Sequence, residues 1–331
     1  MQLIRYIDDV PPALKGGVVA LGNFDGLHRG HQAVIKTAQR IAQEKGVAAA
    51  VMTFEPHPRA FFQPGQAAFR LSPFRIKCRQ MRFRGVDFLY VQRFNASFSG
   101  QTADEFVDQF LVKGLEVSHV VIGYDYVFGN KRGGNADFLI RRGQDAGFGV
   151  TAVEEFRIDA TAQVSSTAIR EFLSEGACAD AARLLGRYWE IAGRVEHGDK
   201  RGRQLGFSTA NVPLGEHHHP REGVYAVRAG VDKGGETVWY DAVANFGRRP
   251  TFNKSDVLLE VHLFDFDESL YNRNLRVGFV EFIRPEQKFD GLDALKAQLS
   301  QDCDTARNIL GKQTFPANPH PFVAMAELDG S

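Results

Sequence analysis

The stretch VVALGNFDGLHRGHQAVI, residues 18–35, constrains the fold of this chain more than any other segment. A short apolar strand ends at Gly22, and an amphipathic helix begins near Gly30 after a tight turn. Such a turn places the helix N-terminus at the carboxyl edge of a sheet, where free N–H groups and the positive end of the helix dipole gather. We therefore predict an α/β unit with an anion-binding site at this turn.

The same alternation of strands and helices continues through the first half of the chain. Strands are expected at 17–22, 47–54, 86–91 and 118–123, and helices at 31–45, 72–84, 103–114 and 136–147. Ser72 is the expected N-cap of the second helix, and Thr102 with Glu105 has capping-box spacing for the third. The pattern predicts a parallel sheet covered by helices, with ligands beyond the carboxyl ends of its strands.

The pattern changes near residue 187. From there the runs alternate, are rich in Val, Tyr and Phe, and are broken by Gly and Asn or Asp turns, which predicts antiparallel β structure. An amphipathic helix is expected at 291–310 and a loosely held tail at 313–331. We therefore expect two domains, residues 1–185 and 187–312.

Charge and cysteine content limit the classes of function. Forty basic residues balance forty acidic ones, so no net charge draws the chain onto nucleic acid or an acidic membrane. Cys78, Cys178 and Cys303 form no CxxC pair, which favours a reducing compartment. No apolar run is long enough to span a bilayer, and the N-terminus lacks the pattern of a signal peptide. We expect a cytoplasmic protein that acts on small molecules and whose oligomeric state the sequence leaves open.

His28 and His31 lie one helical turn apart where the first helix begins. Imidazoles at such a position can donate hydrogen bonds to phosphate oxygens, and these bonds strengthen as charge builds in a transition state. The alternative is two polar residues that only cap the helix. Because the complete segment GNFDGLHRGH follows a strand, a phosphate chain is the favoured ligand.

A second anion site is indicated by VSSTAIREFL, residues 164–173. Ser165, Ser166 and Thr167 stand where a helix begins, and Arg170 follows within about its first turn. Hydroxyls, free N–H groups and a guanidinium together suit an anion. Taken alone, the segment is more typical of a plain N-cap with a surface arginine, but beside the first segment phosphate binding is favoured.

In the second half, GDKRGRQLGFSTANV (198–212) combines glycines with cations. Glycines permit close approach of the backbone to phosphates, and Lys200, Arg201 and Arg203 can supply positive charge. A solvated hairpin loop with a run of charges is the alternative.

Four segments of the first half carry a more specific resemblance: GNFDGLHRGH, TFEPHPRAFF, VIGYDYVFGNKRGG and SSTAIR. In this order they resemble the adenylyltransferase module of the prokaryotic bifunctional riboflavin kinase/FMN adenylyltransferases, a Rossmann-like HxGH nucleotidyltransferase domain. The resemblance implies that FMN attacks the α-phosphorus of ATP, giving FAD and pyrophosphate, through positioning and charge stabilisation without a strong base. Tyr126 stands where the family usually has Phe.

Residue roles in this module follow from the resemblance. It assigns the phosphates of ATP to His28 and His31, with Arg170 as a third catalytic group. The expected contacts with the nucleotide and its triphosphate also include Gly22, Phe24, Asp25, Asp125, Ser165 and Thr167. Aromatic candidates for stacking on the isoalloxazine ring are Phe54, Phe61, Phe62 and Phe128.

The second half resembles the riboflavin kinase of the same family, which implies a small antiparallel β-barrel followed by a C-terminal helix. The likeness rests on 198–212, VANFGRRPTF (243–252) and 258–279. It assigns to Glu260 the role of general base, which takes the proton of the riboflavin 5′-hydroxyl as that oxygen attacks the γ-phosphorus of ATP. Expected ATP contacts are Gly198, Lys200, Gly202, Arg203, Thr209 and Asn211. The last two offer oxygen ligands suited to Mg²⁺.

Some positions depart from the family pattern or have more than one interpretation. Phe246 replaces Ile, Ser208 replaces Pro, and Asn272 replaces Gly, although Asn tolerates positive φ. Arg307 is a tentative flavin contact, but an arginine on a helix is more often at the surface. His217–His219 suggest a metal site, yet successive side chains diverge, which favours a solvated loop.

Two other functions stay open at this point. Another HxGH transferase with a non-catalytic β-barrel binding module would make neither FMN nor FAD from riboflavin, ATP and Mg²⁺. A class I tRNA synthetase fragment would need a lysine loop of the KMSKS type and a basic face for RNA, whereas SSTAIR contains no lysine.

Overall fold

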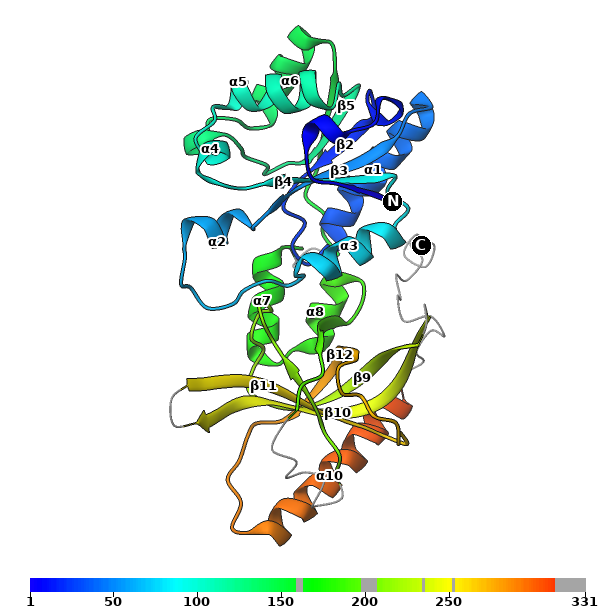
Figure 1. The fold of residues 1–331 in the computed structure, drawn as a ribbon, viewed down its shortest axis with the longest axis vertical. Helices are drawn as coiled ribbons and strands as arrows, with labels where there is room; N and C mark the ends of the chain where they lie inside the picture. The colour runs from blue at the N-terminus through cyan, green and yellow to red at the C-terminus, as the bar shows by residue number, and fades with distance from the viewer. Residues whose placement is uncertain (159–162, 198–206, 234–235, 252–253, 313–331) are drawn as a thin grey trace. The chain divides into compact units, whose positions relative to one another are not determined.

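The structure, a computed structural model, describes residues 1–158, 163–197, 207–233, 236–251 and 254–312 (Figure 1). The chain forms two compact units. The first unit comprises Met1–Ala67 and Ser72–Ser165, and the second comprises Ala68–Leu71 and Ser166–Ser331. The chain therefore enters the second unit briefly at 68–71, returns to the first, and passes over again after Ser165.

The first unit contains a six-stranded parallel sheet with strand order β1-β4-β3-β2-β5-β6. The strands are β1 (Gln2–Ile4), β2 (Val18–Leu21), β3 (Ala49–Glu55), β4 (Phe88–Arg93), β5 (His119–Gly123) and β6 (Gly149–Val153). All of β2 is buried, as is typical of parallel sheets with helices on both faces. From β2 the chain builds outward on one side through β3 and β4, and later on the other side through β5 and β6. The topological switch point therefore lies between β2 and β5, where ligands of such sheets bind.

The helices of the first unit follow the predicted alternation. They are η1 (Ile7–Asp9), η2 (Pro12–Leu14), α1 (Arg29–Lys45), α2 (Pro58–Phe62), α3 (Phe74–Phe83), α4 (Ala96–Ser99), α5 (Ala103–Phe106), η3 (Val107–Gly114), η4 (Asn130–Arg132) and α6 (Ala136–Ala146). The predicted capping box is confirmed: the N–H of Glu105 donates to Thr102 Oγ1 at 3.1 Å, and the N–H of Thr102 donates to Glu105 Oε2 at 2.7 Å.

The prediction of Ser72 as an N-cap is wrong. The helix α3 begins at Phe74 after Pro73, and no side chain caps it. Ser72 is instead fully buried, and its N–H donates to Asp25 Oδ1 at 2.9 Å. The contact of Ser72 with Asp25, 47 residues earlier in the sequence, therefore outweighs the local preference of serine for a helix start.

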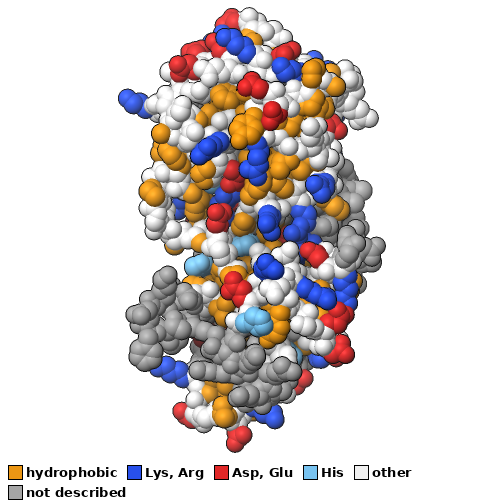
Figure 2. Space-filling view, in the orientation of Figure 1, with side chains coloured by type: hydrophobic (Ala, Val, Ile, Leu, Met, Phe, Trp, Pro, Cys, Tyr) orange, Lys and Arg blue, Asp and Glu red, His pale blue; other side chains and the backbone are white. Residues whose placement is uncertain are grey.

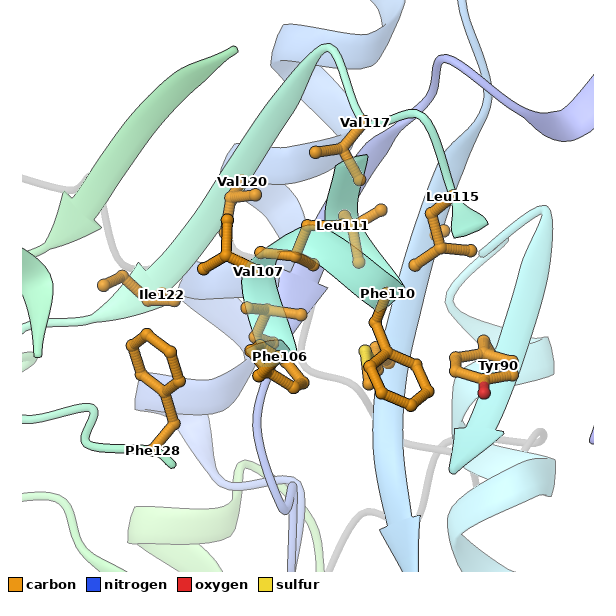
Figure 3. Packing of buried hydrophobic residues seen from close by; sticks show 14 of the residues in the cluster. Tyr90, Phe106, Val107, Phe110, Leu111, Leu115, Val117, Val120, Ile122 and Phe128 are labelled. Atoms are coloured by element: carbon orange, nitrogen blue, oxygen red, sulfur yellow. The ribbon is translucent and has the colours of Figure 1, made fainter. Parts of the chain in front are cut away.

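The first unit has two hydrophobic clusters, one that includes Val34, Ile35 and Ala38 of α1 and one built around the helical segment 103–114 (Figure 3). Its residues Phe106, Phe110 and Leu111 are buried among side chains of the sheet, including Tyr90 and Ile122. The second part of this segment, η3, is wound as a π-helix. The cluster also contains Phe54 and Phe128, two of the candidate flavin residues. These two predicted flavin residues are therefore part of the hydrophobic core.

The second unit contains a six-stranded antiparallel sheet with order β7-β12-β9-β10-β11-β8. The strands are β7 (Trp189–Arg194), β8 (Ala210–Pro213), β9 (Gly223–Lys233), β10 (Glu236–Thr251), β11 (Lys254–Leu263) and β12 (Asn274–Arg284). Just beyond β7, the N–H of Glu196 donates to the carbonyl of Asn211 in β8 at 2.9 Å. Because this bridge links the two edge strands, the sheet curls into the predicted barrel-like shape.

The described part of this unit also contains the helices α7 (Ser166–Glu175), α8 (Cys178–Leu185) and α10 (Leu292–Gly311). Ala306 and Leu310 of α10 are buried against Val224 and Val280 of the sheet. This confirms the predicted C-terminal amphipathic helix. The predicted tail at 313–331 lies outside the described residues.

Residues 68–71 and the histidine run are joined within the second unit. The N–H of Arg70 donates to the carbonyl of Glu216 at 3.0 Å, and the N–H of His218 donates to the carbonyl of Arg70 at 2.9 Å. The prediction of a solvated loop is wrong for His217, which is only 4% exposed. Its Nε2 accepts the N–H of Ala192 at 3.3 Å, so its Nδ1 donates to the carbonyl of Leu214. Within the described ranges, no group of three His, Cys, Asp or Glu side chains is placed to hold a metal ion.

Surface charge agrees with the balanced composition. Figure 2 shows positive and negative side chains interspersed with hydrophobic ones on the face in view. Among the residues that the structure describes, no helix has the length and apolar character needed to cross a membrane.

Candidate active sites

The loop between β2 and α1 is built on unusual backbone angles. Phe24 (φ 49°) and Leu27 (φ 45°) lie in the left-handed region, as does Gly26 (φ 82°). This conformation costs a residue with a side chain about 1–2 kcal/mol. Both Phe24 and Leu27 are almost fully buried, so packing imposes the conformation. Gly22 lies under the Phe24 ring, and a Cβ there would come within 3.1 Å of it.

Hydrogen bonds from the surrounding elements hold the same loop. Thr53 Oγ1 of β3 donates to the carbonyl of Asn23 at 3.1 Å. Asp25, 2% exposed, accepts the N–H of Ser72. Gln32 Nε2 of α1 donates to the carbonyl of Leu27 at 2.8 Å. The turn is therefore fixed from three directions.

The two predicted histidines stand together at the start of α1. His28 is the N-cap, and its Nδ1 accepts the N–H of His31 at 3.3 Å. Their rings stack with centroids 3.6 Å apart and an interplanar angle of 18°. Gly30 leaves space for this stack, since a Cβ there would lie 3.3 Å from the His28 ring. The Nδ1 atom of His31 is buried and has no hydrogen-bond partner among the residues that the structure describes.

Burial, with a smaller contribution from the charge of Lys77, lowers the pKa of His31 to about 3. The ring is therefore neutral at physiological pH, with one N–H donor and one acceptor nitrogen. A neutral imidazole at a helix N-terminus can donate to a phosphate without adding a full charge to a buried site. Its unpartnered nitrogen is the kind of buried polar atom that a ligand satisfies.

Asp125 follows β5, the strand that pairs with β2, so its loop leaves the same edge of the sheet as the turn at 22–28. Asp125 is exposed, and a Cβ at Gly123 would lie 3.2 Å from its Oδ1. In the same loop, Lys131 and Arg132 have positive φ angles of 52° and 59°. The sequence analysis quoted this segment for its family resemblance but did not predict its strained backbone.

The predicted flavin residues belong to a continuous aromatic cluster. Phe61 and Phe62 of α2 both contact Phe94, with ring centroids 5.4 and 5.6 Å apart. Phe94 also contacts Phe54 at 6.2 Å. Phe62 is 64% exposed, whereas Phe54 and Phe128 are 7% and 9% exposed. Sequence analysis missed Phe94, although its place directly after β4 is the signal that could have found it.

The SSTAIR segment forms the start of α7, as predicted, and α7 belongs to the second unit. Arg170 Nε donates to the carbonyl of Phe69 at 2.8 Å, and its Nη1 donates to the carbonyl of Ser166 at 3.2 Å. Ser165 is the last residue of the first unit. The phosphate-binding role of this segment stays a prediction.

The second candidate site is a row of polar side chains across three strands. Glu260 of β11 is paired with Asn211 of β8 on one side and with Asn245 of β10 on the other. Directly opposed residues of antiparallel strands project from the same face, about 5 Å apart. Asn211 is 7% exposed, and within the described ranges its buried Oδ1 has no hydrogen-bond partner. Gly198, Lys200, Gly202 and Arg203 lie outside the described residues.

Two members of this region were missed by sequence analysis. Asn245 Nδ2 donates to Glu286 Oε1 at 3.1 Å, and the carboxylate of Glu286 lies where a Cβ of Gly247 would be. The amide of Asn245 is therefore oriented by Glu286. Asn245 was within a quoted segment, but nothing in the local pattern pointed to Glu286.

The remaining predicted positions contact other residues of the second unit or lie in its turns and core, and the flavin role of Arg307 stays a prediction. Arg307 Nη1 donates to Asp265 Oδ2 at 3.1 Å, and the guanidinium lies 4.2 Å from the Phe264 ring centroid. This hydrogen bond raises the pKa of Arg307. Asn272 has a φ of 63°, as its replacement of glycine predicted. Phe246 is buried at 1% exposure.

Comparison with known proteins agrees with this two-part organisation. A family model described as FAD synthetase matches residues 10–168, and one described as riboflavin kinase matches residues 185–310. A chain with both domains is a flavin-converting transferase. A bifunctional riboflavin kinase/FMN adenylyltransferase of Haemophilus influenzae is 42% identical over 93% of this chain and 98% of its own. One from Escherichia coli K12 is 40% identical over 94% of this chain and 98% of its own.

The chain belongs to the family of bifunctional riboflavin kinase/FMN adenylyltransferases. It phosphorylates riboflavin to FMN with ATP and adenylylates FMN to FAD with release of pyrophosphate. A solved structure described as a macrolide-efflux protein from Streptococcus pneumoniae has a TM-score of 0.82 and 31% identity, covering 92% of this chain and 98% of its own. That description belongs to the other protein, and the fold is what the two share.

The neutral state of His31 predicts a specific dependence of stability on pH. Its pKa is about 3 when folded and 6.5 in the ordinary case, so between these values the unfolded chain binds one more proton. Stability from this group is therefore present above pH 6.5 and is lost as pH falls toward 3. The variant His31→Gln does not have this pH-dependent loss. The Tm of the variant minus the Tm of the unaltered protein should therefore increase as the pH is lowered from 7.5 to 5. Equal differences at the two pH values, measured by thermal unfolding, would contradict the assignment.

Proposed function

We propose that residues 1–185 adenylylate FMN at the turn between β2 and α1, and that residues 187–312 phosphorylate riboflavin around Glu260. The observation that carries the first assignment is the buried, unpartnered Nδ1 of His31 at the N-terminus of α1. That group stands at the sheet's switch point, in the first turn of α1, directly after the loop whose strain is maintained by packing.

Adenylyl transfer needs little from the protein beyond placement and charge stabilisation. An FMN phosphate oxygen forms a bond to the α-phosphorus of ATP while the bond to pyrophosphate breaks. The nucleophile is already an anion, so no strong base is required. His28, His31 and the free N–H groups at the start of α1 donate to phosphate oxygens as negative charge shifts toward the leaving group.

Further contacts in this reaction rest on the family resemblance. Gly22, Phe24 and Asp25 shape the turn that receives the nucleotide, and Asp125 borders the same sheet edge. Ser165, Thr167 and Arg170 are kept as triphosphate contacts on the resemblance alone.

For the flavin ring, exposure favours Phe62 and its neighbour Phe61 over Phe54 and Phe128, whose rings are mostly covered by protein. Phe94 supports the stacking surface from behind.

Riboflavin phosphorylation requires a base, because a hydroxyl is a poor nucleophile. Glu260 accepts the proton of the 5′-hydroxyl while that oxygen forms its bond to the γ-phosphorus and ADP leaves. Asn211 and Asn245 flank this carboxylate by strand register. Gly198, Lys200, Gly202 and Arg203 remain proposed ATP contacts, and Arg307 a proposed flavin contact.

Asn211 and Thr209 suit a magnesium ion, which would neutralise phosphate charge in the kinase site. The fit rests on the buried Asn211 Oδ1, an oxygen that lacks a protein partner. A cytoplasmic location is also inferred, supported by three free cysteines whose thiol pKa values burial raises. Because the chain belongs to this family, the two alternative functions considered from the sequence are set aside.

Replacing His31 by Ala should lower the rate of FAD formation from FMN and ATP by at least about 100-fold, since a donor to the transition state is lost. Riboflavin phosphorylation in the same sample should stay unchanged, because it uses Glu260 and its neighbours. Both products are separated by chromatography. Loss of both activities in a folded variant would contradict separate sites.

Glu260→Gln keeps the shape of the side chain and removes the base. Riboflavin phosphorylation should fall by about 100-fold or more, while FMN adenylylation continues at its normal rate. The matched control is Glu281→Gln, an exposed position on β12. An undiminished kinase rate in Glu260→Gln would remove this residue from the base role.

Asn211→Ala removes the unpartnered oxygen. The magnesium concentration needed for half-maximal riboflavin phosphorylation should rise by about 10-fold, as expected for loss of one oxygen ligand. The magnesium concentration needed for half-maximal FMN adenylylation should not change. The measurement is the rate of each reaction against free Mg²⁺, and an unchanged kinase curve would exclude Asn211 as a ligand.

A further inference from the structure

Lys77 of α3 is a buried cation to which neither reaction above assigns a part. Its side chain is 0% exposed. Lysine is rarely buried so completely unless it is paired, because removing its charge from water is costly. Its Nζ donates to Glu55 Oε1 at 3.2 Å and to Thr53 Oγ1 at 3.2 Å.

The contact with Thr53 connects Lys77 to the strained turn. A threonine hydroxyl has one proton to donate and lone pairs that accept. Because Lys77 donates to Thr53 Oγ1, the hydroxyl proton is directed to its other partner, the carbonyl of Asn23 at 3.1 Å. Asn23 lies between Gly22 and Phe24, the residue with a φ of 49°.

Lys77 and the segment before its helix act on this turn together. The N–H of Ser72, two residues before α3 begins, donates to Asp25 of the turn. The charge of Lys77 also contributes to the lowered pKa of His31, second to burial. The short segment 72–77 thus contacts the turn at Asp25 directly through Ser72, and at Asn23 through Lys77 and Thr53.

We propose that Lys77 is a positioning residue for FMN adenylylation, which acts through Thr53 on the backbone of the turn at 22–28 and so aims His31 at the phosphates. This rests on the proposed role of His31. The competing explanation is that Lys77 and Glu55 form a buried ion pair that serves stability alone.

Variants of Thr53 separate these explanations. Thr53→Val removes the hydroxyl and leaves the ion pair intact, while Thr53→Ser keeps the hydroxyl and loses a methyl group. Under the proposal, kcat for FAD formation falls by about 10–100-fold in Thr53→Val, because displaced catalytic groups act poorly, and stays near normal in Thr53→Ser. The KM for FMN stays within about twofold in both. Riboflavin phosphorylation by the same samples reports that the second unit is folded, and the Tm of each variant reports whether the first unit, which contains Thr53, is folded.

Variants of the ion pair provide the second test. Lys77→Met removes the cation beside Glu55, whose side chain is only 18% exposed, and should lower Tm. The double variant Lys77→Met/Glu55→Gln removes the charge of Glu55 as well, so its Tm should recover while kcat for FAD formation remains low. Glu55→Gln alone shows whether the carboxylate is needed, and Lys45→Met, an exposed lysine of α1, is the matched control.

The outcomes are distinguishable. If kcat recovers together with Tm in the double variant, or if Thr53→Val is as active as Thr53→Ser, Lys77 is structural and the inference is overturned. His31→Ala is assayed alongside these variants. If His31→Ala loses FAD formation while the Lys77 and Thr53 variants keep full activity, the proposed site is supported and only this inference is overturned. Normal FAD formation in His31→Ala overturns the proposed site and the inference together.

Discussion

The left-handed turn between β2 and α1 is the constraint on which the proposed adenylylation site depends. Phe24 and Leu27 adopt backbone angles that are unfavourable for residues with side chains, and burial of these same side chains keeps them there. The result is a helix N-terminus with two stacked imidazoles at the switch point of a parallel sheet. Hydrogen bonds from β3, from α1 and from the segment before α3 hold the turn rigid, as a site that works by positioning requires.

The two proposed sites differ as their reactions do. The phosphate nucleophile of adenylylation is already charged, and its site offers N–H donors and a neutral imidazole. The hydroxyl nucleophile of phosphorylation needs a base, and its site offers a carboxylate flanked by two amides in strand register. A helix terminus provides the first arrangement and an antiparallel sheet provides the second, so each half of the chain has a fold suited to its chemistry.

Features set by local pattern could be predicted from the sequence, and those set by long-range contacts could not. Periodicity located the four inner strands of the parallel sheet but neither edge strand, β1 or β6, and the Thr102 capping box is local by nature. Ser72 was misassigned because its N–H is used by Asp25, far away in sequence. Lys77 was overlooked because a lysine in an amphipathic helix is normally exposed. The alignment of Asn211 with Glu260 depends on β8 adding beside β11, an order that no local pattern reveals.

Two ATP-dependent reactions at separate sites require two nucleotide sites in one chain, and counting these sites is the most direct test. The intact protein is titrated with α,β-methylene ATP and Mg²⁺ in the absence of flavin, using calorimetry. We expect two molecules bound per chain, with one lost in His31→Ala and the other retained. A single site, or a stoichiometry that does not change in His31→Ala, would contradict the account.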